Sequence, residues 1–208
     1  MLFRSRIGVA AAAHDALVVH FSTDYVFDGE KSSPYLETDP PNPISVYGES
    51  KLAGEMALAA AGCRYLIFRT SWVYAPRGRN FVLAILAAAR TKPELRVVDD
   101  QHGAPTSSTA IAEAVARVLS SPKARSGTTD SIYHMSAAGE TTWHGFATMI
   151  VRSAGLKTPV VPIRSEQYPV AARRPKNSRL DNTKLLASFG IALGDWRAEA
   201  AAVLAAIH

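Results

Sequence analysis

Tyr47 and Lys51 stand four residues apart, and they follow a stretch that contains Thr23, Asp24 and Tyr25. On a helix, residues i and i+4 project from one face, so the phenol and the ammonium can meet at one small-molecule centre. A nearby ammonium stabilises a phenolate, which turns tyrosine into a usable general acid or base. These residue types and this spacing predict proton transfer to or from a bound small molecule.

A buried parallel strand and a helix are expected to position these residues. The apolar run Ala16–Phe21 is typical of such a strand, and it ends directly before Ser22 and Thr23. Catalytic groups are expected at the carboxyl ends of parallel strands. A polar, proline-rich loop follows, and then a helix from about residue 45 to 61, which Gly62 stops.

The rest of the chain alternates between strand-like and helical segments, which indicates an α/β fold. An Ala-rich helix, rather than a signal peptide, is expected before the first strand, because His14 and Asp15 interrupt the apolar run. Further strands are expected at residues 64–69, 95–98 and 132–135, and further helices at residues 80–90, 108–119, 143–154, 182–189 and 196–207.

The composition excludes several classes of protein. With 208 residues, 48% of them hydrophobic, the chain can form a globular core. Cys63 is the only cysteine, so internal disulfides and cysteine metal clusters are excluded, and a cytoplasmic location is expected. No groove-reading motif accompanies the net charge of +5, and no apolar run suits a membrane span, so neither nucleic acid nor membrane is an expected partner. His102, His134 and His144 lack metal-ligand spacing, so no metal is expected.

Five blocks in order resemble the extended short-chain dehydrogenases/reductases, and among them the dTDP-4-dehydrorhamnose reductase family. Together the blocks extend over nearly the whole chain, which makes them far more specific than any single one. They are Ser22–Gly29 (STDYVFDG), Tyr47–Glu55 (YGESKLAGE), Arg69–Tyr74 (RTSWVY), Asp100–Thr106 (DQHGAPT), and Arg174–Pro175 with Leu180–Asp181. The fold that this resemblance implies is a truncated Rossmann-like, doubly wound parallel sheet with a smaller α/β C-terminal region. It implies a partial NAD(P)-binding, Rossmann-like catalytic domain over residues 1–130, interleaved with a substrate-binding region over residues 131–208.

The resemblance also implies a reaction: reduction of dTDP-4-dehydrorhamnose to dTDP-L-rhamnose by hydride transfer from NADPH or NADH. Tyr47 would donate a proton to the 4-keto oxygen, and Thr23 would hydrogen-bond that oxygen. Lys51 would hold the nicotinamide ribose, and Ser22 would join Tyr47 and Lys51 in binding the cofactor. The implied partners are a dTDP-sugar and a second copy of the chain. The implied substrate-binding residues are Thr23, Asp24, Tyr25, Trp72, Asn80, Gln101 and Arg174.

The family opens with a strand, a Gly-rich turn and a helix, whose backbone N–H groups cradle the cofactor pyrophosphate. The sequence contains no G-x-G-x-x-G pattern. We therefore expect roughly three βα units of the family fold to be missing from it. The strand that ends at Phe21 is then expected to lie at an unpaired edge of the sheet.

Two other functions stay open on the sequence alone. A nucleotide-sugar epimerase or dehydratase belongs to the same superfamily, but such enzymes usually lack the cluster Thr23–Tyr25 together with Trp72. A non-catalytic protein similar to the regulatory subunit of methionine adenosyltransferase shares the fold. The absent Gly-rich turn favours this second alternative, whereas the intact Thr23, Tyr47 and Lys51 disfavour it.

Overall fold

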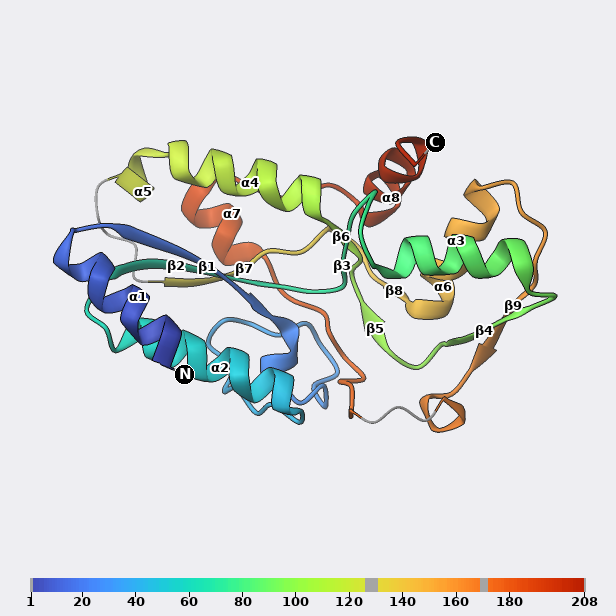
Figure 1. Ribbon diagram of the computed structural model, residues 1–208, viewed down its shortest axis with the longest axis horizontal. Coiled ribbons are helices and arrows are strands. Elements are labelled where there is room, and N and C mark those ends of the chain that lie inside the picture. The colour runs from blue at the N-terminus through green and yellow to red at the C-terminus, as the bar shows by residue number, and fades with distance from the viewer. Residues whose placement is uncertain (1, 126–130, 169–171, 208) are drawn as a thin grey trace.

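Three parallel strands form the central sheet of the computed structural model, which describes residues 2–125, 131–168 and 172–207 (Figure 1). The sheet has the order β1-β2-β7, with β1 at Leu17–Thr23, β2 at Arg64–Thr70 and β7 at Ser131–His134. The register of β1 and β2 places Thr23 opposite Thr70, so their carboxyl ends lie at the same edge. This parallel sheet confirms the expected Rossmann-like α/β fold.

Helices cover both faces of the sheet, as Figure 1 shows. The alternation of side chains along β2 explains this, because successive residues of a strand point to opposite faces. Ile67 packs with Leu58 on one face, whereas Phe68 packs with Leu185 and Val118 on the other. The helices are α1 (Leu2–Ala13) and α2 (Val46–Ala59) on the first face, and α4 (Ser108–Ser120) and α7 (Thr183–Phe189) on the second.

Local signals at its two ends explain the position of α2, which lies within two residues of the predicted bounds. The Ser45 hydroxyl caps the helix by accepting a hydrogen bond from the Gly48 N–H at 3.2 Å. After the helix, Gly62 has φ +68°, a left-handed conformation that favours glycine, and the chain turns into β2.

A second hydrophobic core lies beside the sheet, and Tyr74, Phe146 and Trp196 are among its buried members. Residues from before and after position 130 contribute to both cores, and the domain division at that position stays a prediction. None of the helices in the described ranges is long and apolar enough to cross a membrane. The second core is built by α3 (Phe81–Thr91), α6 (Trp143–Ser153), α8 (Trp196–Ala205), β4 (Leu95–Val98) and β9 (Val160–Ile163), and the short pairs β3 (Val73–Tyr74) with β6 (Thr106–Ser107) and β5 (His102–Gly103) with β8 (Thr141–Thr142) lie nearby.

β1 is the outer strand of this sheet among the described residues, as the sequence predicted. It is less buried than expected. Residues 17–20 are half-buried and Phe21 is 42% exposed, while only Ser22 and Thr23 are fully buried. An edge strand has a neighbour on one side only, so the prediction of a buried strand was wrong for its first five residues.

Candidate active site

The carboxyl end of β1 leads directly into one turn of 3₁₀ helix, η1 (Asp24–Val26). Thr23 caps this turn, since its Oγ1 accepts a hydrogen bond from the Tyr25 N–H at 3.2 Å and donates one to Asp24 Oδ1 at 3.0 Å. Thr23 and Asp24 are both buried. The turn therefore gathers a hydroxyl, a carboxylate and a phenol at the end of the strand.

α2 places Tyr47 and Lys51 beside this turn. Tyr47 is 54% exposed, and its ring meets the ring of Tyr25 edge-on with the centroids 5.7 Å apart. The Lys51 ammonium donates a hydrogen bond to the carbonyl oxygen of Phe21 in β1. The three residues that the sequence assigned to catalysis, Thr23, Tyr47 and Lys51, thus stand at one corner of the fold, and their roles stay predictions.

Gly48 allows α2 to approach η1 this closely. A Cβ atom at this position would lie 2.1 Å from the carbonyl oxygen of Tyr25, far closer than two such atoms can come. Only glycine therefore fits between the helix and the turn. The contact fixes the first turn of α2 against η1, and it keeps Tyr47 next to Tyr25.

Burial governs the ionisation of the polar side chains in η1. Burial raises the pKa of Asp24 to about 6, although hydrogen bonds from Ser178 and Thr23 oppose the shift. Burial also raises the pKa of Tyr25 to about 12, aided by the charge of Asp24 and opposed by that of Arg174. At neutral pH the Asp24 carboxyl group is therefore charged in the fold, although its burial costs free energy.

Replacement of Asp24 by Asn tests this cost. The folded pKa of Asp24 lies above its ordinary value of 3.8, so the fold favours the protonated carboxyl group. The resulting stabilisation is complete below about pH 3.8, and it is lost as the pH rises through about 6. We expect the stability difference between Asp24→Asn and the native chain to move in favour of the variant by about 2 to 3 kcal/mol from pH 4 to pH 8. Urea unfolding at the two pH values measures it.

Asp28→Asn is the matched control for that measurement. Hydrogen bonds from the Glu30 N–H and from Tyr35 lower the pKa of Asp28. Its carboxylate therefore stabilises the fold above the ordinary value and loses this effect on acidification, so the pH trend of the Asp28 variant has the opposite sign. A difference for Asp24→Asn that does not change with pH would contradict the prediction.

A cavity of about 610 Å³ borders the loop between η1 and α2, which contributes Asp28 and Ile44 to its wall. The residues that line the rest of the cavity come from four segments that are distant in the sequence. Cations and aromatic rings of this kind suit a ligand that combines phosphates with a planar ring. The cations are Arg96, Arg173, Arg174 and Lys176, and the aromatic rings are Phe81, Trp143 and Tyr168.

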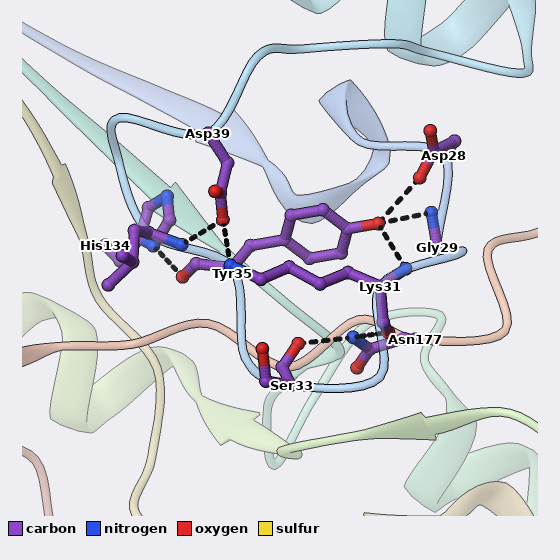
Figure 2. A network of polar contacts seen from close by, with 9 residues as sticks. Asp28, Gly29, Lys31, Ser33, Tyr35, Asp39, His134 and Asn177 are labelled. Atoms are coloured by element: carbon purple, nitrogen blue, oxygen red, sulfur yellow. Dashed lines mark hydrogen bonds and ion pairs between the residues drawn. The ribbon is translucent and has the colours of Figure 1, made fainter.

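Figure 2 shows how the loop after η1 is held in place. The Tyr35 hydroxyl donates a hydrogen bond to Asp28 Oδ1 at 2.6 Å and accepts one from the Gly29 N–H at 3.0 Å. Asn177 Nδ2 donates to the carbonyl oxygens of Lys31 and Ser33, at 2.7 and 2.9 Å. The loop that supplies Asp28 to the cavity is thereby fixed to the same segment that supplies Arg174 and Lys176.

Comparison with known proteins assigns the chain to a family. Residues 2–208 match the family model described as RmlD substrate binding domain. The chain is 49% identical over 205 residues to the dTDP-4-dehydrorhamnose reductase of Burkholderia thailandensis, covering 92% of this chain and 69% of that protein. It belongs to the dTDP-4-dehydrorhamnose reductase family. The Escherichia coli K12 member is 43% identical over 199 residues, covering 91% of this chain and 66% of its own length.

Solved structures of the reductase family share the fold. The Clostridium acetobutylicum reductase has a TM-score of 0.91 at 35% identity, covering 98% of this chain and 70% of that one. The Bacillus anthracis reductase, solved in complex with NADP, has a TM-score of 0.87 at 32% identity, covering 98% and 69%. The chain spans about two thirds of the length of the curated relatives it matches.

Gln101 and Arg174, two of the residues that the reductase resemblance assigned to substrate, line the cavity, whereas Trp72 does not. Trp72 is 9% exposed, and its ring stacks on Trp143 at 3.7 Å between centroids. A Cβ on Gly103 would lie 2.6 Å from the same ring. Trp72 therefore packs between Trp143 and Gly103, and Trp143 is the ring that reaches the cavity.

Thr23, Asp24, Tyr25 and Asn80 also lie outside the cavity lining: Thr23 to Tyr25 belong to the end of β1 and to η1, and Asn80 caps α3. Asn80 Oδ1 accepts a hydrogen bond from the Leu83 N–H at 3.3 Å, and its Nδ2 donates to the Ala75 carbonyl oxygen at 2.9 Å. The sequence interpretation missed several lining residues, and only two of them carried a signal, as members of the basic run Arg173–Lys176. The missed residues include Phe81, Arg96, Trp143, Ser165, Tyr168, Arg173 and Lys176.

Proposed function

We propose that this chain carries the catalytic and substrate-binding part of an enzyme that reduces dTDP-4-dehydrorhamnose to dTDP-L-rhamnose with NADPH. One observation carries the proposal: Thr23, Tyr47 and Lys51 meet at the end of β1, and the adjoining loop forms a wall of the cation-lined cavity. A sugar nucleotide with its diphosphate in the cavity would extend its sugar toward Tyr47.

In the proposed reaction Tyr47 donates its phenolic proton to the 4-keto oxygen. Thr23 orients that oxygen by redirecting to it the hydroxyl proton that it donates to Asp24 in the absence of substrate. Tyr47 is exposed enough to meet a ligand, whereas Thr23 is held by its contacts in η1. Asp24 and Tyr25 shape the floor beneath the sugar. The chain thus supplies the proton and the orientation, and the reduced nicotinamide, when bound, supplies the hydride.

Donor groups at the edge of β1 fit the nicotinamide ribose. The Ser22 hydroxyl is buried with no hydrogen-bond partner among the described residues. It follows directly after Phe21, whose carbonyl oxygen receives the Lys51 ammonium. A ribose diol in this place would offer partners to both side chains. The cofactor of the Bacillus anthracis relative, NADP, supports NADPH as the reductant.

The reductase is favoured over the two alternative functions. The dTDP-4-dehydrorhamnose reductases of Burkholderia thailandensis and Escherichia coli K12 are 49% and 43% identical to the chain. A dTDP-glucose 4,6-dehydratase from Streptomyces venezuelae and a UDP-glucuronic acid 4-epimerase from Bacillus cereus are only 19% and 18% identical, a likeness of fold alone. Intact Thr23, Tyr47 and Lys51 argue against a non-catalytic protein. The proposal includes a cytoplasmic location and a homodimer.

NADPH oxidation tests the proposed function. The chain is assayed as it stands and as a chimaera, fused behind the part of the Burkholderia thailandensis relative that precedes the matched region. We expect the chimaera to oxidise NADPH only when dTDP-4-dehydrorhamnose is present, and dTDP to inhibit it. A folded chimaera that binds dTDP but leaves NADPH unchanged would overturn the proposal.

A further inference from the structure

Glu55 and Arg69 form an ion pair that is almost completely buried. Arg69 Nε donates a hydrogen bond to Glu55 Oε1 at 3.0 Å, and Arg69 Nη2 donates one to Glu55 Oε2 at 2.7 Å, so the ion pair is bidentate. The two side chains are 3% and 2% exposed. Such a contact fixes both the distance and the angle between the groups that it joins.

The pair joins the two elements that form the candidate active site. Glu55 lies on α2 four residues after Lys51 and eight after Tyr47, so all three residues share one side of the helix. Arg69 lies on β2 directly opposite Ser22 of β1, one residue before the position opposite Thr23. The pair therefore ties the helix that carries Tyr47 to the strand beside the one that carries Thr23.

Net stability alone does not account for such a pair. Burying two charges costs about as much as their attraction returns, and an apolar pair of similar volume is often at least as stable. Arg69 Nη1, moreover, is buried with no hydrogen-bond partner among the described residues. What the ion pair supplies, and an apolar pair does not, is a defined position of α2 along the sheet.

We propose that Glu55 and Arg69 are a positioning pair, which sets the place of Tyr47 and Lys51 relative to Thr23. Gly48 fixes the first turn of α2 against η1, and the Glu55–Arg69 pair fixes the helix two turns later. Two anchors prevent the helix from sliding or rotating, whereas one would not. The catalytic consequence rests on the proposed reductase function, while the positional one does not.

The double variant Glu55→Met/Arg69→Met tests the proposal, because it removes both charges and leaves neither a charge nor an amide buried without a partner. The chain is labelled with 3-fluorotyrosine, and the Tyr47 signal is assigned by its loss in Tyr47→Phe. We expect the ¹⁹F signal of Tyr47 to shift or broaden, with the melting temperature and the dTDP affinity close to native. In the chimaera we expect kcat to fall about 10-fold or more while KM for the sugar nucleotide changes less than about 3-fold.

Arg69→Lys keeps the charge but cannot form the bidentate contact, so it tests the proposal even if the double variant does not fold. We expect the same change in the Tyr47 signal and the same split between kcat and KM. The matched control is Asp15→Asn/Arg64→Met, which removes an ion pair at the other end of β2. It should leave the Tyr47 signal and kcat unchanged.

An unchanged Tyr47 signal in both Glu55→Met/Arg69→Met and Arg69→Lys would overturn the proposal, as would equal effects in the Asp15/Arg64 control. A native chimaera without turnover would count against the reductase function alone. In that case the ¹⁹F signal of the unfused chain still decides whether the pair positions Tyr47.

Discussion

Tyr47→Phe is expected to lower kcat of the chimaera by about 10²-fold or more, since it removes the transferable proton and keeps the aromatic ring. The ring of Tyr47 meets Tyr25 edge-on, and phenylalanine preserves this contact. The substrate should therefore still bind, with KM close to native. Steady-state NADPH oxidation with dTDP-4-dehydrorhamnose measures both constants.

Tyr65→Phe is the control for that experiment, because it removes a tyrosine hydroxyl from β2, at a strand position four residues before Arg69. Its kcat should stay within a few-fold of native. If Tyr47→Phe also retained turnover within a few-fold of native, Tyr47 would not be the general acid.

Arg174→Gln is expected to weaken dTDP binding by about 10- to 100-fold, the loss typical of a charge-assisted hydrogen bond. Arg174 lines the cavity together with Lys176. Because the proposed partner of these cations is the diphosphate, thymidine binding should not change. Titration calorimetry of the unfused chain with dTDP and with thymidine separates the two cases.

Arg117→Gln removes the same charge from an exposed position on α4, and it should leave both affinities as they are. Equal loss of dTDP and thymidine affinity in Arg174→Gln would point to a distorted cavity. If neither the dTDP affinity nor the thymidine affinity fell, Arg174 would not be part of the proposed phosphate site.

The placement of Thr23, Tyr47 and Lys51 together could be predicted, because the sequence patterns that indicate it are local. An apolar run that ends in hydroxyl and acidic residues, and a Tyr/Lys pair at helical spacing, are enough to place Thr23, Tyr47 and Lys51 together. The cavity could not be predicted in the same way, because its residues come from segments that meet only in the folded chain. Trp72 illustrates the limit. The family resemblance suggests a ring that stacks on the sugar, whereas in the structure the ring stacks on Trp143 and lies against Gly103.

The bonds that hold the loop after η1 also constrain the order in which the chain assembles. Asn177 reaches back 146 residues to Lys31, and the Tyr35 N–H donates to the carbonyl oxygen of Arg179. Contacts of such long sequence separation form late, since the loop-closure entropy must be overcome first. During synthesis, β1, α2 and β2 leave the ribosome well before these partners exist. The loop after η1 therefore acquires its final conformation only when the segment that contains Asn177 and Arg179 has been made.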